Sequence, residues 1–400
     1  MEKAKQNAQY TFKYNKSLGR HGWLRLTPAY SVKIVQQIIE NLDYKPQNVL
    51  EPFSGTGTTE LVCANLGIPS VAYDINPFLA WFAETKTKQY AAEIIQEFID
   101  TTENIIENIG AFNPCEYPPI YRIERWWGAR QLDFLARLKS AILDIDNASV
   151  RDLHKISFCR TIISLSNAAF NHVSTSFKDS TEDSYFDDSI GIEMYDSVCH
   201  TIAETAKIQP IVEPIIINAN SMNLDSCGAC FDTVITSPPY PNRISYIREL
   251  RPYMYWLDYL SSSDAASALD WETIGGTWGS ATSKLSSWKY KSGLLPEYLL
   301  DIADNISKAD NKSAELMAQY VLKYFDDIAK HLRSVYECMC DGGTVHYIVG
   351  NSNFYGNTVP SEKIYSDLLV AAGFQNASYQ IVRKRNCNKE LFEFLITAKK

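Results

Sequence analysis

Apolar residues along the chain form short continuous runs in some places and helically spaced stretches in others. The run "NVLEPF" (48–53) is typical of a buried strand, "SGTGTT" (54–59) of a tight turn, and "TELVCANLG" (59–67) of a helix. The next run, "PSVAYDINP" (69–77), predicts a second strand with Asp74 at its carboxyl end. Strand, turn, helix and strand form a βαβ unit, and this unit predicts a parallel sheet.

Further elements follow the same two patterns outside this unit. Helical spacing predicts helices over 31–42, 247–260, 313–338 and 361–372, the last one closed by Gly373. Apolar runs predict strands at 211–218, 231–237 and 342–352, and "ASYQIVRKRN" with "KELFEFLITA" predicts a final antiparallel pair.

Two stretches interrupt the alternation of strands and helices. Residues 86–210 show helical periodicity over 86–109 and 130–170, whereas residues 261–312 are rich in Ser, Gly and Trp. We therefore predict an α/β domain assembled from residues 1–85, 211–260 and 313–400. A mainly helical insertion would occupy 86–210, and a loop-rich insertion would occupy 261–312.

The turn at 54–59, hereafter the glycine turn, has the composition of a ligand site. Backbone N–H groups at a helix start after glycines can face a ligand closely. A dinucleotide site would need a third glycine where Glu60 stands, and the lysine of a phosphate-binding loop is missing too. Glu51 and Phe53 instead suit an ammonium and an adenine, and Asp74 suits a ribose. S-adenosylmethionine combines these three parts; the simpler interpretation is a helix-capping turn with a surface Asp.

The second candidate site is "SPPY" (237–240), hereafter the corner, which directly follows the predicted strand at 231–237. Two successive prolines make the backbone stiff and extended. Ser237 Oγ and the Pro238 carbonyl would then accept both hydrogens of an exocyclic amino group and free the lone pair of its nitrogen, while Pro239 holds Tyr240 as a stacking surface. The simpler interpretation is a proline turn after a strand.

Composition limits the class of protein. The 400 residues are 46% hydrophobic, contain no run long enough for a membrane span, and begin with a charged stretch unlike a signal peptide, so we expect a cytoplasmic protein. Nine irregularly spaced cysteines argue against a disulfide framework, and the lone pair Cys227 and Cys230 lacks a partner pair for zinc, so we predict no metal site. The net charge of −9 hides basic stretches near both ends of the chain.

The segments "EPFSGTGTT", "YDIN" and "SPPY" together resemble the cofactor, ribose and catalytic motifs of the amino-methylating DNA methyltransferases. The S-P-P-Y form is more typical of the cytosine-N4 enzymes, which belong to restriction-modification systems. "RLTPAYS" (25–31) is similar to the segment that precedes their cofactor motif, and "GGTVHYIVGNSNF" is similar to one of their closing strands. Residues 86–210 have no counterpart in this resemblance.

The resemblance implies a Rossmann-like class I methyltransferase fold with S-adenosylmethionine as cofactor. Its mostly parallel sheet would end in an antiparallel strand pair. Catalysis would belong to Ser237, Pro238, Pro239 and Tyr240. Cofactor contacts would come from residues in the leading segment, the glycine turn and the following strands: Thr27, Tyr30, Glu51, Phe53, Gly55, Gly57, Asp74 and Asn220. Asn220 stands where such enzymes often carry an acidic residue near the adenine.

Duplex DNA is the partner that the resemblance implies, with a target base flipped out of the helix. Target-reading segments lie outside the motifs, so the candidates are 86–210 and 258–312. Cations near aromatic residues or near the corner are candidate DNA contacts: Arg125, Arg130, Arg243, Arg248 and Arg251. Helical cores and salt-bridged helices explain these arginines equally well, and a polar helix explains Asn167 and His172 better than DNA contact does.

The sequence thus predicts a DNA methyltransferase that modifies cytosine N4, with a cognate restriction endonuclease as a candidate partner. Methylation of adenine N6 on the same fold is a close alternative. RNA and protein-glutamine methyltransferases also use a proline-proline-tyrosine corner, usually with Asn or Asp before it. A non-catalytic binding module that retains the fold is a third class.

Overall fold

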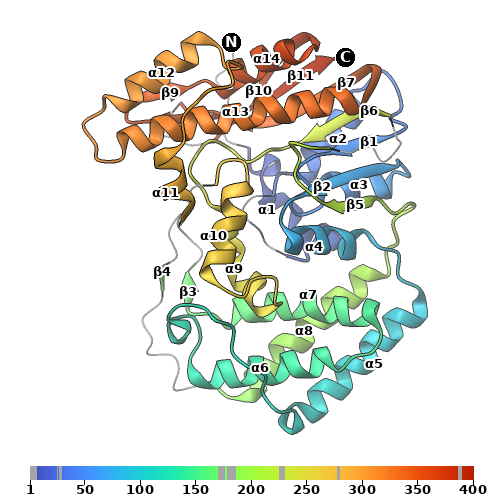
Figure 1. The fold of residues 1–400 in the computed structure, drawn as a ribbon. Coiled ribbons are helices and arrows are strands. Elements are labelled where there is room, and N and C mark those ends of the chain that lie inside the picture. The colour runs from blue at the N-terminus through green and yellow to red at the C-terminus, as the bar shows by residue number, and fades with distance from the viewer. Residues whose placement is uncertain are drawn as a thin grey trace.

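The computed structural model describes residues 7–24, 26, 29–169, 176–177, 186–224, 230–276, 280–385 and 390–400. Its central element is a seven-stranded sheet with the order β10-β11-β7-β6-β1-β2-β5 and helices on both faces (Figure 1). The strands are β1 (Val49–Glu51), β2 (Ser70–Asp74), β5 (Ile215–Asn218), β6 (Phe231–Thr236), β7 (Met339–Gly350), β10 (Gln375–Lys384) and β11 (Phe392–Lys399). Two small sheets are formed by β3 (Ala168–Ala169) with β4 (Ser176–Phe177) and by β8 (Ser352–Phe354) with β9 (Asn357–Val359).

The sheet is parallel except at one edge. Strand β1 pairs in parallel with β2 and β6, β2 with β5, and β6 with β7. Strand β11 runs antiparallel to both of its neighbours, β7 and β10. This arrangement confirms the predicted class I methyltransferase fold, including the antiparallel closing pair. Because the chain leaves β1 toward β2 on one side and reaches β6 on the other, a crevice forms beyond the carboxyl ends of these strands.

The helices surround the sheet and extend below it (Figure 1). They are α1 (Phe12–Asn15), α2 (Val32–Glu40), α3 (Thr58–Asn65), α4 (Pro77–Thr87), α5 (Ala92–Asn108), α6 (Ala129–Leu143), α7 (Ala148–Ser164), α8 (Asp188–Ala206), α9 (Tyr246–Trp256), α10 (Ser263–Glu272), α11 (Ser280–Ser287), α12 (Glu297–Ser307), α13 (Ala314–Cys338) and α14 (Ser361–Ala372). Short 3-10 turns are η1 (Ala8–Tyr10), η2 (Gly19–Gly22), η3 (Ile109–Ala111) and η4 (Ile123–Arg125). No helix in the described ranges is long and apolar enough to cross a membrane.

The buried apolar residues form three clusters, two of them on opposite faces of the sheet. One face of the sheet packs on α2 and α3 through residues such as Val35 and Ile348, and the other packs on α12, α13 and α14 through residues such as Val234 and Tyr347. A third cluster joins the helices α5 to α8 with α4 and α9, and it contains Phe78 and Trp256 from the latter two. The helical insertion therefore shares its core with two helices that flank the crevice.

Arg20 ties the insertion to the sheet-bearing part. Its guanidinium is buried and donates to the carbonyl of Lys86, at 3.2 Å, and to that of Ala206, at 2.8 Å. These carbonyls belong to the last turns of α4 and α8, where a cation is favoured by the helix dipole. One buried cation thus satisfies two helix ends that are far apart in the sequence.

Two sequence predictions need correction. The prediction of a loop-rich segment over 261–312 is wrong, because α10, α11 and α12 lie there. Ser262 caps α10 by accepting from the N–H of Ala265, so this serine starts a helix rather than marking a loop. Cys230, which directly precedes β6, and Cys340 on β7 form a disulfide that the irregular cysteine spacing did not predict. Cys227 lies outside the described residues.

Candidate active site

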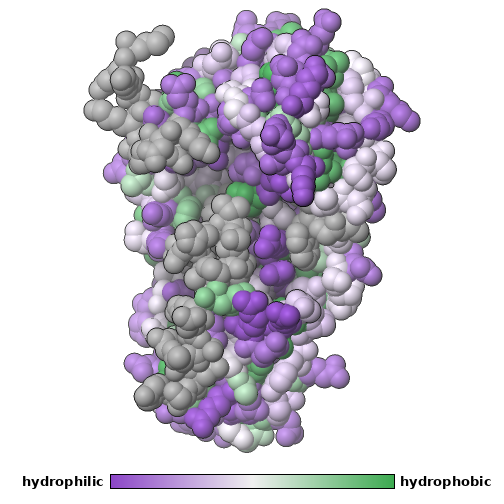
Figure 2. Space-filling model, turned by 90° about the vertical axis from the view of Figure 1, so that its left-hand side faces the viewer, coloured by the Kyte–Doolittle hydropathy of each residue, from purple (hydrophilic) through white to green (hydrophobic). Residues whose placement is uncertain are grey.

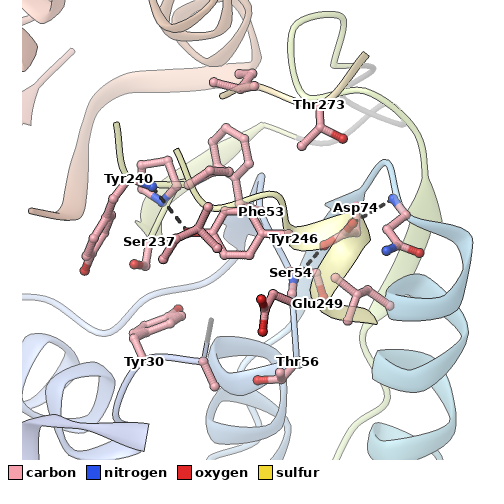
Figure 3. A pocket seen from close by; sticks show the side chains of 18 of the residues that line it. Tyr30, Phe53, Ser54, Thr56, Asp74, Ser237, Tyr240, Tyr246, Glu249 and Thr273 are labelled. Carbon is pink, nitrogen blue, oxygen red and sulfur yellow. Dashed lines mark hydrogen bonds between the residues drawn. The ribbon is translucent and has the colours of Figure 1, made fainter. Parts of the chain in front are cut away.

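A cavity of about 640 Å³ lies at the carboxyl ends of β1, β2 and β6. The residues from the predicted cofactor and catalytic motifs that line it are Tyr30, Phe53, Gly55, Asp74, Asn220, Ser237, Pro238, Pro239 and Tyr240. Figure 3 shows Ser237 and Tyr240 on one side of this space and Asp74 on the other. The structure thus brings the two predicted sites together in one cavity.

The glycine turn is fixed by Asp74. One carboxylate oxygen accepts from the N–H of Gly55 at 2.8 Å, and the other accepts from the N–H of Asn76 at 2.8 Å. Gly55 has φ +53°, a conformation that favours glycine, and it borders the cavity. Burial raises the pKa of Asp74 to about 7. Each carboxylate oxygen keeps a lone pair that can accept from a hydroxyl such as that of a ribose.

Glu51 lies behind the cavity wall rather than in it. Its side chain is fully buried and accepts from Tyr30 Oη at 2.7 Å, Thr59 Oγ1 at 2.9 Å and the N–H of Phe53 at 3.0 Å, and it also bonds Thr236 Oγ1. Burial raises the pKa of this carboxyl well above its usual range. Its predicted cofactor contact stays a prediction, because Glu51 is not among the residues that line the cavity. Gly57 does not line the cavity either, and Thr27 lies outside the described residues.

Phe53 is held against a buried histidine. Its ring meets that of His331, on α13, edge to face with centroids 4.7 Å apart. His331 Nδ1 lies 2.9 Å from the carbonyl of Ser221, and Nε2 lies 2.8 Å from Tyr347 Oη. A carbonyl can only accept, so Nδ1 carries the proton and Nε2 accepts from Tyr347. Burial lowers the pKa of His331 to about 4, so the imidazole is neutral at pH 7.

The corner is held by neighbouring strands and helices. Ser237 Oγ donates to the carbonyl of Ile348 on β7, at 3.2 Å, and Tyr324 Oη donates to the carbonyl of Pro239, at 2.6 Å. The guanidinium of Arg385 lies over the Tyr240 ring, 5.0 Å from its centroid. The Ser237 hydroxyl proton is therefore directed at the protein. Its oxygen also contacts the Tyr240 hydroxyl and keeps a lone pair for a donor in the cavity.

Several residues that line the cavity were not predicted from the sequence. Tyr10, Thr11, Phe12 and Lys13, at η1 and α1, border the cavity, and so do Tyr246 and Glu249 from the first turns of α9. No motif marks these positions. For α9 the one signal in the sequence was its place directly after the corner.

Two of the five arginines predicted to contact DNA, Arg125 and Arg251, pack on aromatic rings. Arg251 lies over the Trp126 ring at 5.3 Å from the centroid, Arg125 lies over Phe177 at 4.5 Å, and those two rings contact each other edge to face. Residues from 122–130 and 243–251, distant in sequence, thus form one cation-aromatic cluster. It joins α9 to the insertion.

The other candidates lie in different environments. Arg130 donates to the carbonyl of Phe186 and borders a small hollow with Asp133, Asp187 and Asp188, so its surroundings are acidic. Arg243 is exposed, with its N–H on Tyr320 Oη at 3.1 Å, and Arg248 is half-buried on α9. His172 lies outside the described residues, and the N–H of Asn167 donates to the carbonyl of Trp126.

On the face drawn in Figure 2, hydrophilic side chains predominate, and apolar ones are scattered among them.

No protein-family model matches the chain. It is 38% identical over 68 residues to the Type II methyltransferase M.BsoBI of Geobacillus stearothermophilus, which is 17% of this chain and 13% of that protein. It is 32% identical over 89 residues to the Type II methyltransferase M.MjaII of Methanocaldococcus jannaschii, covering 20% and 17%. The chain thus matches less than a fifth of the length of either relative.

A third relative matches over most of the chain, but at a lower sequence identity. The Type II methyltransferase M.MvaI of Kocuria varians is 20% identical over 359 residues, covering 84% of this chain and 76% of that protein. Among solved structures, the rRNA methyltransferase aviRa from Streptomyces viridochromogenes aligns with a TM-score of 0.30 at 9% identity, covering 92% of this chain and 86% of that one.

The residues present fit S-adenosylmethionine. The volume lies within the range of about 300–1,000 Å³ that small-molecule sites occupy. Phe53 offers an aromatic edge and face for a purine, and Asp74 offers carboxylate oxygens for ribose hydroxyls. Gly55 leaves the backbone accessible in the turn that leads into α3. Among described residues, no group of three or more His, Cys, Asp or Glu is arranged to hold a metal ion.

Proposed function

We propose that this chain is a site-specific DNA methyltransferase that transfers a methyl group from S-adenosylmethionine to the N4 amino group of a cytosine flipped out of duplex DNA. The observation that carries the proposal is the contact of Ser237 Oγ with the Ile348 carbonyl, in a cavity shared with Phe53 and Asp74. The three relatives, all Type II methyltransferases, support the transfer of methyl groups to DNA. A restriction partner and a cytoplasmic location belong to the same proposal.

The chemical problem is a poorly nucleophilic amino group. The lone pair of cytosine N4 is delocalised into the ring, so a planar amino group reacts slowly. Ser237 Oγ directs its own proton to Ile348 and can therefore accept one amino hydrogen. The Pro239 carbonyl is engaged by Tyr324, so we assign the second acceptor to the carbonyl of Pro238. Two acceptors favour a pyramidal nitrogen whose lone pair points away from the ring.

S-adenosylmethionine, when bound, supplies a methyl group that its sulfonium already activates. The protein must therefore orient the two reactants and exclude water more than it must provide a base. Tyr240, backed by Arg385, offers a ring on which the flipped base stacks. The N–C bond would form as the S–CH3 bond of the sulfonium breaks, so S-adenosylhomocysteine would be the leaving group. The nitrogen would then be strongly acidic, and its extra proton would pass to solvent by way of the hydrogen bond to Ser237 Oγ.

The cation-aromatic cluster around Arg251 and Trp126 is our candidate for phosphate contact. Arg251 lies on α9, the helix whose first turns border the cavity, so phosphates held there would bring DNA close to it. We place Arg125 with it, and Arg243 and Arg248 are further candidates. The acidic neighbours of Arg130 make it the weakest of the five.

The product nucleoside tests the proposal. Protein, duplex DNA and methyl-labelled S-adenosylmethionine are incubated, and the DNA is digested to nucleosides. We expect the label in deoxycytidine methylated at N4. Label in N6-methyladenine would replace the cytosine assignment by its rival on the same fold, whereas label that enters RNA or protein but not DNA would overturn the DNA proposal.

A further inference from the structure

Four carboxylate side chains line the cavity. Two of them are engaged by other groups of the protein, and a third is exposed to solvent. Asp74 accepts from two backbone N–H groups. Glu393 forms a two-point ion pair with Arg383, at 2.5 and 2.6 Å. Glu272 is exposed, and its carbonyl accepts from Asn220. The fourth is Glu249. Among the residues that the structure describes, its carboxylate makes no hydrogen bond or ion pair within 4 Å, and the positive charges nearest to it are those of Arg248 and Arg251 on its own helix.

Glu249 lines the cavity together with three residues of the glycine turn, Ser54, Gly55 and Thr56. Figure 3 draws its side chain in the same part of the view as Ser54 and Thr56, whereas Tyr240 lies on the other side. The helix that carries it is firmly anchored. Ser245, the N-cap of α9, donates to Asp270 at 2.5 Å and accepts from the N–H of Arg248, and Met254 Sδ contacts the amide of Asn76 at 3.5 Å. Glu249 is thus a half-buried carboxylate on a rigid support.

The cofactor's amino-acid end should lie at the same place. Asp74 is suited to the ribose. Ser54, Gly55 and Thr56, which lead into α3, border the cavity, so a carboxylate placed beside them would lie toward the positive end of that helix. An amino acid carries its ammonium on the carbon next to that carboxylate, so the ammonium must also lie beside the glycine turn. Glu51, the predicted acceptor, already accepts from Tyr30, Thr59 and Phe53 behind the wall.

We infer that Glu249 binds the α-ammonium group of the cofactor, in place of Glu51. The inference rests on the proposed function, since it concerns the ligand assigned to this cavity. It gives α9 two roles. Its first turns border the cavity that would hold the cofactor, and Arg251, two residues beyond Glu249, belongs to the cation-aromatic cluster.

The test compares two ligands that differ in the ammonium-bearing part. Binding of S-adenosylhomocysteine and of 5′-methylthioadenosine is measured by calorimetry at pH 8 for the unmodified protein, Glu249→Gln, and Glu249→Asp. We expect Glu249→Gln to weaken S-adenosylhomocysteine binding at least tenfold and to leave 5′-methylthioadenosine binding unchanged. Glu249→Asp should restore part of the loss. Glu193→Gln, an exposed change on α8, is the matched control.

Three results would overturn the inference. Equal weakening of both ligands would mean that Glu249 supports the cavity rather than the ammonium. Unchanged binding of S-adenosylhomocysteine would mean that Glu249 does not touch it, even if methylation fell. If the unmodified protein bound neither ligand, the proposed function itself would fail, and this outcome is distinguishable from the other two.

Discussion

Ser237 Oγ donates to the main-chain carbonyl of Ile348, so the hydroxyl proton is held by the neighbouring strand at 3.2 Å. A hydroxyl can donate only one hydrogen but can accept two. The contact therefore turns Ser237 into an acceptor toward the cavity, although nothing in its own chemistry requires this. In the mechanism that we propose, this hydrogen bond to β7 would let a hydroxyl serve as the acceptor that a carboxylate provides in other active sites.

Replacing Ser237 by Ala removes this acceptor with little change in shape. We expect the methylation rate to fall about 100-fold or more, the order found when one preorganised polar group is removed from an active site. Cofactor affinity should stay within about twofold, because the hydroxyl is assigned to the base. Single-turnover kinetics and calorimetry check the two parts. Ser378→Ala, at an exposed position on β10, should behave as the unmodified protein.

An unchanged rate in Ser237→Ala would contradict the assignment of this oxygen. A parallel loss of cofactor affinity would point to a role in binding the cofactor instead.

Gly350→Ala should disturb Tyr240 without touching the glycine turn. A Cβ at position 350 would lie 2.5 Å from Arg385 Nη1 and 2.9 Å from a Tyr240 ring carbon, both too close. We expect the ring to shift and kcat to fall about tenfold or more, with cofactor affinity preserved. At Gly110 the same change meets no atom within 4 Å, so Gly110→Ala is the control. Equal activity of the two variants would mean that Tyr240 does not position the base.

His331 should make stability depend on pH. Its pKa is lowered by burial from about 6.5 in the unfolded chain to about 4 in the native state. Between these values the unfolded state binds more protons, so the free energy of unfolding falls as pH drops from 6.5 toward 4 and is flat above 6.5. The full shift corresponds to roughly 3 kcal/mol.

Denaturant unfolding of the unmodified protein and of His331→Gln at pH 7.5 and pH 5 isolates this group. The difference in unfolding free energy between the two proteins should be larger at pH 7.5. Burial also lowers the pKa values of His154 and His346, but these groups titrate in both proteins and cancel in the comparison. A difference that grows as pH falls has the opposite sign to our prediction.

Arg251→Gln should weaken DNA binding and reduce its salt dependence. Removing one cation from a phosphate lowers the slope of log affinity against log salt by about 0.9. We expect a slope change of about one for Arg251→Gln and none for Lys312→Gln, an exposed cation between α12 and α13. Fluorescence titration at several salt concentrations measures both. Weaker binding with an unchanged slope would mean that Arg251 only packs on Trp126.

Local motifs made the fold predictable, and also the positions of the two halves of the candidate site. Gly55 and Asp74 belong to one βαβ unit, and the corner follows directly on β6, so each lies where the carboxyl ends of parallel strands meet. The helices α13 and α14 were predicted within one residue because their apolar spacing is regular. Serine-rich composition was misleading at α10, where Ser262 acts as an N-cap.

The contacts that were not predictable join segments far apart in the sequence. Ser237 reaches Ile348 across 111 positions, and His331 reaches Ser221 across 110. The burial of Glu51 likewise depends on Tyr30, Thr59 and Thr236 meeting behind one strand. No local pattern encodes which of two carboxylates, Glu51 or Glu249, faces the cavity, because packing between strands and helices decides it.

The most direct measurement is a structure of the protein with S-adenosylhomocysteine and a duplex whose target cytosine is extruded. We predict that the cytosine N4 lies within hydrogen-bond distance of Ser237 Oγ and the Pro238 carbonyl, with the ring on Tyr240 and the thioether sulfur facing that nitrogen. A base bound away from the corner, or a cofactor bound outside the cavity lined by Phe53 and Asp74, would contradict the proposed mechanism.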